Sequence, residues 1–244
     1  GKSHMIKVLS HLLENRAVTR NSQTRRALEF LGDSDIDRML LGDMERAAAV
    51  PTDAILFNID NKADSKSGRD AVLSVFLKVL NERLGYSGDH AHIANMEYQL
   101  DQEGKLQPFH NAYALASGST WDTDRDAYQF HTGEIAGALA AATGQTQQSQ
   151  EAWLDTAEEG FELSVEHLCR RVKAHLGSQA PNHRVLFLAD EVGQFIGEDT
   201  HLMLNLQTIA EGLGSECEGR GWIVVTSQED IDKVLGVKSQ ASSY

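Results

Sequence analysis

Hydrophobic residues in this chain form two kinds of pattern, one typical of buried strands and the other of helices. Continuous apolar runs at residues 54–59, 184–190 and 222–227 are bounded by polar or turn-forming residues and predict three buried strands. Elsewhere apolar residues recur every three or four positions, which predicts amphipathic helices. We expect these helices at residues 3–15, 34–49, 70–84, 150–176 and 200–213, with another beginning at 229–235. Strands of this kind separated by helices indicate an α/β fold, in which helices sandwich a parallel sheet.

The stretch before the first predicted strand has a weaker pattern. Residues 17–33 are polar and basic, and we interpret them as a loop or a short helix. The helix at 34–49 is expected to begin at Ser34, whose side chain can cap it, and to stop before Pro51.

The segment 85–148 is predicted to be a helical insertion within the main domain, because it is rich in aromatic, small and Gln residues. Its short helices are expected at about 92–102, 108–116, 124–131 and 133–142. Residues 144–150 are interpreted as a linker. Three aromatic residues of the insertion are more typical of a core than of a partner contact: Trp121, Tyr128 and Phe130.

The charge balance narrows the function. The chain has 22 Lys and Arg against 36 Asp and Glu, which gives a formal net charge of −14. Because non-specific nucleic-acid binding depends on neutralising phosphates, we expect DNA to be contacted only indirectly. No apolar run reaches the roughly 18 residues needed to cross a bilayer, and no signal peptide is visible, so a cytoplasmic protein without membrane association is expected.

Cysteine and histidine spacing offers little support for a disulfide or a metal site. Cys169 and Cys217 lie far apart and belong to no CxxC pair, so we expect free thiols. His90 and His92 form a His-x-His pair, but no second ligand pair follows at metal-site spacing. We therefore expect these two histidines to be solvated loop residues.

Gly1-Lys2-Ser3 stands directly before a predicted helix. A phosphate-binding loop has the pattern GxxxxGK[ST] between a strand and a helix, and these residues match its second half. Gly1 would let backbone N–H groups close around phosphates, Lys2 would reach the β- and γ-phosphate oxygens, and Ser3 would bind Mg²⁺. The same tripeptide also occurs by chance in surface turns before helices, so this motif alone leaves both interpretations open.

Asp190 and Glu191 are adjacent acids at the carboxyl end of the predicted strand 184–190. In P-loop ATPases, Asp190 would hold Mg²⁺ through water at this position. Glu191 would orient and deprotonate the attacking water, a task typically worth about 10²–10⁴ in rate. Two solvated acids in a strand-to-helix turn would have the same sequence, so here too two interpretations remain.

Thr226, Ser227 and Gln228 follow the last predicted strand. In AAA+ folds a polar residue here touches the γ-phosphate and the attacking water, and Ser227 and Gln228 are the candidates. A Ser or Thr before Glu229 and Asp230 would equally cap a following helix. Because the phosphate loop, the acids and the polar sensor occur in the order of an ATPase site, we predict a P-loop NTPase of the AAA+ (ASCE) type with ATP and Mg²⁺ as cofactors.

With these motifs placed, a resemblance to a known family becomes visible. The segment 186–197 (LFLADEVGQFIG) resembles the Walker B segment of the large P-loop ATPases of bacterial BREX phage-defence systems, the BrxC and PglY family. Further segments that resemble the family are 1–4 (GKSH), 9–15 (LSHLLEN), 55–64 and 223–230. The resemblance implies that His4 joins Gly1, Lys2 and Ser3 at the nucleotide.

The resemblance implies an ATPase that serves as motor or switch of a defence complex that blocks phage DNA replication and marks host DNA by methylation. Its implied partners are a methyltransferase and a phosphatase-like protein, and the full-length protein is expected to be a homo-oligomer. Family members are much longer, so residues 1–244 are expected to be a truncated ATPase core. The first strand would precede Gly1, and the helical lid and arginine finger would follow Tyr244, so this piece is expected to hydrolyse ATP slowly or not at all.

Two other functions remain open on the sequence. One is a nucleotide-gated scaffold that binds ATP with little turnover, and the other is an initiator-type or signalling AAA+ ATPase. A scaffold needs only Lys2, Ser3 and Asp190, whereas Glu191 argues for turnover. Basic DNA-reading modules in a longer sequence would favour the initiator.

Overall fold

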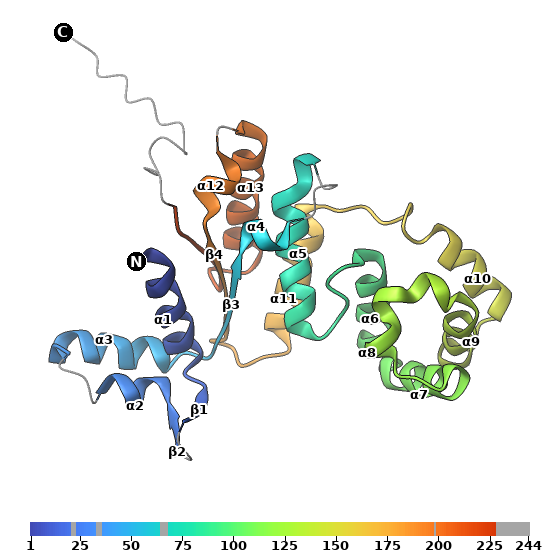
Figure 1. Ribbon diagram of the computed structural model, residues 1–244, viewed down its shortest axis with the longest axis horizontal. Coiled ribbons are helices and arrows are strands. Elements are labelled where there is room, and N and C mark those ends of the chain that lie inside the picture. Colours follow the sequence, from blue (N-terminus) through green and yellow to red (C-terminus); the bar gives the residue numbers. More distant parts are fainter. Residues whose placement is uncertain (21–22, 33–35, 64–67, 198, 228–244) are drawn as a thin grey trace, which may run out of the picture. The chain divides into compact units, whose positions relative to one another are not determined.

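The computed structural model describes residues 1–20, 23–32, 36–63, 68–197 and 199–227 (Figure 1). The chain forms two compact units. The first comprises Gly1–Phe76 together with the chain from Ser164 onward, and the second comprises Leu77–Leu163. The second unit is wider than the predicted insertion at 85–148.

The first unit is built on a parallel sheet of three strands, β3 (Thr52–Asn58), β4 (Arg184–Asp190) and β5 (Gly221–Val225), in the order β3-β4-β5. The three predicted strands are thereby confirmed, although β5 ends before the predicted residue 227. The protein is α/β, with helices flanking this sheet (Figure 1).

One face of the sheet is covered by α1 (Lys2–Glu14), the first predicted helix. Ile6 and Leu13 of α1 share an apolar cluster with Ala54, Leu186 and Leu188. These three strand residues lie on one face because successive side chains of a strand alternate between faces, and the register pairs Ala54 with Leu186.

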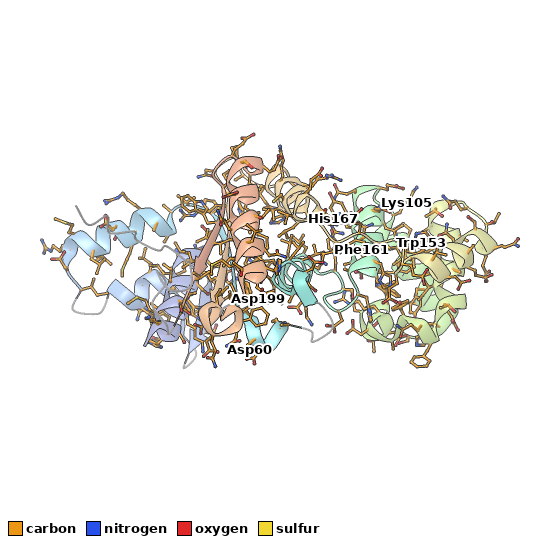
Figure 2. All side chains as sticks on the ribbon, turned by 90° about the horizontal axis from the view of Figure 1, so that it is seen from above. Asp60, Lys105, Trp153, Phe161, His167 and Asp199 are labelled. Atoms are coloured by element: carbon orange, nitrogen blue, oxygen red, sulfur yellow. The ribbon has the colours of Figure 1, made fainter. Side chains whose placement is uncertain are left out.

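The opposite face carries aromatic packing. The ring of Phe76 in α5 (Ala71–Leu84) lies with its centroid 5.4 Å from that of Phe57 and 5.1 Å from that of Phe187. Helix α11 (Val165–Gly177) packs against β4 and against α13 (Thr200–Glu216), and α13 contacts β5. Asp199, labelled in Figure 2, caps α13 by accepting hydrogen bonds from the backbone N–H groups of His201 and Leu202.

The N-terminal region differs from the sequence prediction at two points. Residues predicted as a loop or a short helix form an antiparallel hairpin of β1 (Ala17–Arg20) and β2 (Gln23–Arg26), followed by α2 (Ala27–Gly32). The hydroxyls of Thr19 and Thr24 face each other across the hairpin at 2.9 Å, and β-branched residues favour strands.

The cap of the next helix also differs. Helix α3 (Arg38–Ala48) begins after Asp37, whose carboxylate accepts hydrogen bonds from the N–H groups of Met39 and Leu40. Ser34, the predicted cap, lies outside the described residues, as does the helix predicted at 229–235. Three short elements complete this unit: α4 (Ile59–Lys62), η1 (Gly68–Asp70) and α12 (Val192–Ile196).

The second unit is helical. Its elements beyond the end of α5 are α6 (Ala91–Gln102), α7 (Leu106–Ser117), α8 (Trp121–Asp124), η2 (Arg125–Phe130), α9 (Thr132–Thr143) and α10 (Gln147–Thr156). Three of the four predicted helical stretches are confirmed as α6, α7 and α9, whereas the fourth, 124–131, is the 3₁₀ segment η2, interrupted at Ala127 by φ −110° and ψ 26°. The linker predicted at 144–150 is wrong. Helix α10 starts there because the Thr146 side chain caps it by accepting the N–H of Ser149.

The long helix predicted at 150–176 is also wrong, because the chain forms α10 and α11 with residues 157–164 between them. Gly160 carries a high cost in a helix interior. Ser164 then starts a new helix by accepting the N–H of His167 at 3.1 Å. Each of the two helices is amphipathic by itself, and their apolar residues follow one another at intervals of three and four positions. The sequence pattern therefore looks like that of one continuous helix.

Aromatic residues form the centre of the second unit. Trp121 and Tyr128 are buried, as predicted for core residues, whereas Phe130 is 84% exposed. The Trp121 indole donates a hydrogen bond to the buried Glu97 carboxylate at 2.7 Å, and the Ser87 N–H donates to the same carboxylate at 2.6 Å. Burial raises the pKa of Glu97 despite these hydrogen bonds.

A pocket of about 340 Å³ opens in the second unit, bordered by Lys105 and Trp153, which Figure 2 labels, and by Leu100 and Leu139. Among the described residues, no helix has both the length and the apolar character that crossing a membrane requires.

Candidate functional site

The start of α1 and the carboxyl ends of the strands meet in the first unit. Figure 1 shows α1 running alongside β3, with its N-terminal end towards the end of the sheet where the strands finish. The Lys2 ammonium donates a hydrogen bond to the Ser227 carbonyl at 2.6 Å. The Ser3 hydroxyl donates to the Asp190 carboxylate at 3.2 Å. Three predicted site segments, far apart in the sequence, are therefore adjacent in space.

Asp190 is the centre of this group. It is the last residue of β4, is 8% exposed, and receives hydrogen bonds from the hydroxyls of Ser3 and Thr226 on the same carboxylate oxygen. The Thr226 hydroxyl also accepts the backbone N–H of Glu191 at 3.1 Å. Thr226 therefore links the segment after β5 to both acids, whereas the sequence singled out its neighbours Ser227 and Gln228 as candidates for contacting the γ-phosphate and the attacking water.

Glu191 follows β4 in a left-handed backbone conformation, with φ 63° and ψ 26°. This conformation costs a residue with a side chain roughly 1–2 kcal/mol. The Asn58 carboxamide donates a hydrogen bond to the Glu191 carboxylate. Asn58 ends β3, directly opposite Asp190 in the strand register, so the parallel pairing brings it to this edge of the sheet. Sequence reasoning missed Asn58, although its place at the end of a predicted strand was a usable signal.

Ser227 is buried against Gly193 in the first turn of α12. A Cβ atom on Gly193 would lie 1.9 Å from the Ser227 hydroxyl oxygen and 2.7 Å from its Cβ, so only glycine fits there without displacement. The Ser227 carbonyl, rather than its side chain, receives Lys2. Gln228, the other predicted sensor, lies outside the described residues.

Gly1 and His4 occupy the first turn of α1. Gly1 is the N-cap, and its carbonyl accepts the N–H groups of His4 at 3.1 Å and Met5 at 3.2 Å. Both Gly1 and His4 are exposed. The structure thus brings Ser3 to Asp190 and Lys2 to the Ser227 carbonyl, and His4 is an exposed residue of the same helical turn.

Lys2, Ser3 and Asp190 offer the kinds of atoms that bind a phosphate group and its Mg²⁺ ion. The Ser3 hydroxyl and the Asp190 carboxylate offer adjacent oxygen donors, the type that Mg²⁺ prefers. Lys2 supplies a positive charge at the N-terminus of a 13-residue helix, where backbone N–H groups and the helix dipole favour anions. These residues fit a magnesium-bound phosphate group.

The His-x-His pair and the two cysteines noted in the sequence pack against other residues of the fold. His92 is buried rather than solvated, because the rings of His90 and His92 pack on Tyr128 with centroids 4.9 and 5.1 Å from it. Cys169 and Cys217 are free thiols, as predicted, and both are buried. Burial raises the pKa of Cys169 to about 11, so it is an unreactive thiol at neutral pH.

In comparisons with known proteins, no family model matches the chain, and no solved structure matches it.

Proposed function

We propose that this chain is the ATP-binding and ATP-hydrolysing core of a P-loop ATPase of the AAA+ type. The observation that carries the proposal is the convergence of Lys2 and Ser3 with Asp190 and Ser227 at one edge of the parallel sheet. A surface turn before a helix would give Lys2 and Ser3 no reason to contact residues more than 180 positions away. The strand order β3-β4-β5 is also compatible with a P-loop fold.

Binding follows from the first turn of α1. Lys2 exchanges the Ser227 carbonyl for β- and γ-phosphate oxygens, and the N–H groups at the start of α1 stabilise the anion. Ser3 and Asp190 are the residues that would hold Mg²⁺, and the ion would supply charge neutralisation at the phosphoryl group. Thr226 keeps the Asp190 carboxylate oriented towards Ser3, because its hydroxyl bonds the same oxygen.

Hydrolysis depends on Glu191. Its carboxylate accepts a proton from the attacking water, whose oxygen then bonds to the γ-phosphorus as the bond to ADP breaks. Asn58 fixes one carboxylate oxygen of Glu191, and Thr226 fixes its backbone N–H. This positioning favours turnover over the scaffold alternative, which requires no oriented base.

On the resemblance of segment 186–197, we further propose that the protein is the motor or switch of a bacterial BREX-type defence complex. Its partners are a methyltransferase and a phosphatase-like protein, and it acts in the cytoplasm as a homo-oligomer that reaches DNA only indirectly. Co-purification of these partners from cells carrying the whole system tests this. A lack of co-purification, with phage resistance unaffected by Lys2→Ala, would contradict it.

Calorimetric titration of the chain with ATP in Mg²⁺ tests the nucleotide site. Lys2→Ala should weaken ATP binding about 10- to 100-fold, because a hydrogen bond to a charged group contributes about 1.5–3 kcal/mol. Lys7→Ala is the matched control, since Lys7 is an exposed lysine of the same helix, and it should leave affinity unchanged. Equal effects of the two substitutions would refute specific binding at Lys2.

Glu191→Gln separates binding from hydrolysis. It should keep ATP affinity and reduce any phosphate release by about 10²–10⁴-fold. Retained ATP affinity together with unchanged phosphate release would remove Glu191 from the mechanism and leave the binding proposal intact.

A further inference from the structure

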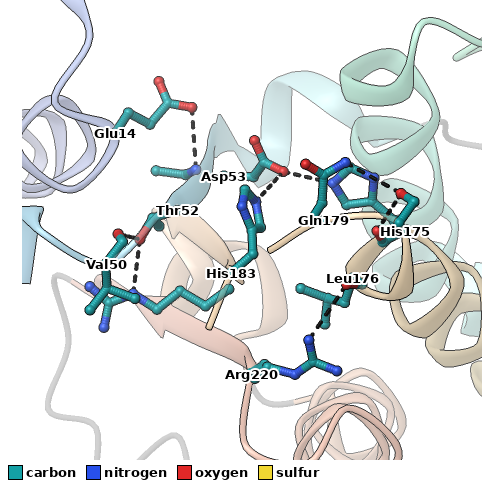
Figure 3. Close-up of polar contacts among 12 residues, drawn as sticks. Glu14, Val50, Thr52, Asp53, His175, Leu176, Gln179, His183 and Arg220 are labelled. Atoms are coloured by element: carbon teal, nitrogen blue, oxygen red, sulfur yellow. Dashed lines mark hydrogen bonds and ion pairs between the residues drawn. The ribbon is translucent and has the colours of Figure 1, made fainter. Parts of the chain in front are cut away.

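Three ligand-type side chains converge at the amino-terminal edge of the same sheet (Figure 3). Asp53 is the second residue of β3, His175 lies in the last turn of α11, and His183 directly precedes β4. The Nε2 atoms of His175 and His183 lie 2.7 and 2.9 Å from the same oxygen of Asp53, Oδ2. Their ligand atoms all lie within 4.8 Å of one another.

This cluster is separate from the candidate nucleotide site. His183 and Asp190 stand at opposite ends of β4. Seven residue steps separate them, and at about 3.3 Å per step along a strand the two lie about 23 Å apart. Any ion held by the cluster therefore serves a different role from Mg²⁺ at Asp190.

The backbone around the histidines is fixed by local hydrogen bonds. The His175 carbonyl accepts the Ser178 N–H at 3.0 Å and the Ser178 hydroxyl at 2.7 Å. The His183 N–H donates to the Ala180 carbonyl at 2.9 Å. The two imidazole rings lie with their centroids 6.0 Å apart and their planes at 89° to each other, so they do not stack and both reach the same oxygen of Asp53.

The cluster contains one carboxylate and lies beside charges of both signs, since the Arg184 guanidinium donates a hydrogen bond to the Thr52 hydroxyl, next to Asp53, at 2.9 Å. All three side chains are largely buried, with exposed fractions of 12–17%. Close by, the Glu14 carboxylate accepts the N–H of Ala54, next to Asp53, although Arg16 partly compensates its charge.

The spacing is close to that of a bound ion. Bonds of about 2.0–2.1 Å in a tetrahedral zinc site place ligand atoms roughly 3.4 Å apart. The observed contacts of 2.7 and 2.9 Å are shorter than this, so a small outward rotation of the side chains would admit the metal. Two imidazoles and one carboxylate suit Zn²⁺ and related divalent transition ions, and not Mg²⁺, which prefers oxygen.

We propose that Asp53, His175 and His183 bind one divalent transition-metal ion of the Zn²⁺ class, with water completing its coordination. The ion joins the start of β3, the start of β4 and the end of α11, three segments that lie up to 130 residues apart in the sequence. The ion therefore crosslinks these segments at the amino-terminal edge of the sheet, whether or not a nucleotide is bound.

Metal titration of the chelator-treated chain tests this site, with Co²⁺ followed by its visible absorption and Zn²⁺ by calorimetry. One ion per chain should bind, and millimolar Mg²⁺ should not compete. His183→Ala should weaken binding at least ~100-fold, because loss of even an outer-shell partner costs about 10–100-fold. His201→Ala, which removes an exposed histidine of the same unit, is the matched control and should bind normally.

His175→Gln separates loss of a metal ligand from loss of the fold, because the glutamine amide can still donate a hydrogen bond to Asp53 but is a poor ligand for Zn²⁺. It should keep the circular dichroism spectrum of the parent chain and lose Co²⁺ binding. Lys2→Ala should retain Co²⁺ binding, which separates this site from the nucleotide site. The proposal is overturned if no ion binds, if His183→Ala and His175→Gln both bind normally, or if Lys2→Ala abolishes binding. The three side chains would then form a hydrogen-bonded cluster only.

Discussion

Gly193→Ala tests the close packing that holds Ser227 in place. The added Cβ would lie 2.7 Å from the Ser227 Cβ and 1.9 Å from its hydroxyl oxygen. Optimal carbon–carbon contact is about 3.5–4.0 Å, so the Ser227 backbone must move by roughly 1 Å. Overpacking of this size costs about 1–3 kcal/mol, and we expect that loss in urea unfolding followed by circular dichroism.

Gly214→Ala is the control, since Gly214 lies within α13 and a Cβ there meets nothing within 4 Å. It should stabilise the chain by about 0.5–1 kcal/mol through better helix propensity. Combining Gly193→Ala with Ser227→Gly removes both clashing atoms, so the alanine should cost little in that background. If Gly193→Ala costs the same with and without Ser227→Gly, the steric reasoning is refuted.

Three further predictions follow from single residues. Burial raises the pKa of Glu97 above 4.5, so the fold gains stability from protonated Glu97 at low pH and loses it as pH rises through the native pKa. Glu97→Gln should lower the free energy of unfolding overall but make it fall less steeply with pH, in urea unfolding measured from pH 4.5 upward. An unchanged slope of stability against pH would contradict this. In the full-length protein, Asn58→Ala should reduce ATP turnover by up to about 10²-fold with ATP affinity unchanged, because a misplaced catalytic group loses its alignment with substrate. Turnover equal to that of the parent protein would exclude a positioning role. Glu218→Gly should raise the free energy of unfolding by about 0.5–1 kcal/mol, since Glu218 is exposed at φ 53°, and a loss of stability in urea would show that its side chain matters more than its backbone.

The sheet could be predicted from sequence because its strands are continuous apolar runs with polar ends. Residues 184–190 match β4 at both ends, and Asp190 stands where that pattern placed it. Helix boundaries were harder to predict where one amphipathic helix follows another and the apolar residues keep the same three- and four-residue spacing. Nothing in the apolar spacing of 150–176 marks a break, whereas the capping contact of Ser164 depends on the folded turn.

The candidate site was predictable only where a residue carries a local motif. Lys2, Ser3 and Asp190 stand in recognisable patterns, but Asn58 gains its place from pairing with β4, 132 positions away in register. Thr226 was within a recognised motif, yet only the structure shows that its hydroxyl meets Asp190. The cluster of Asp53, His175 and His183 was not predictable, because the two histidines lie 122 and 130 residues from Asp53.

The measurement that tests the central claim most directly is unfolding of the chain with and without Mg²⁺-ATP, compared with Lys2→Ala. A ligand at 100 times its Kd should add about 2.7 kcal/mol to the free energy of unfolding. The account predicts this gain for the parent chain and for Lys7→Ala, and none for Lys2→Ala. No gain in the parent chain at saturating nucleotide, or an equal gain in Lys2→Ala, would contradict a nucleotide site at the start of α1.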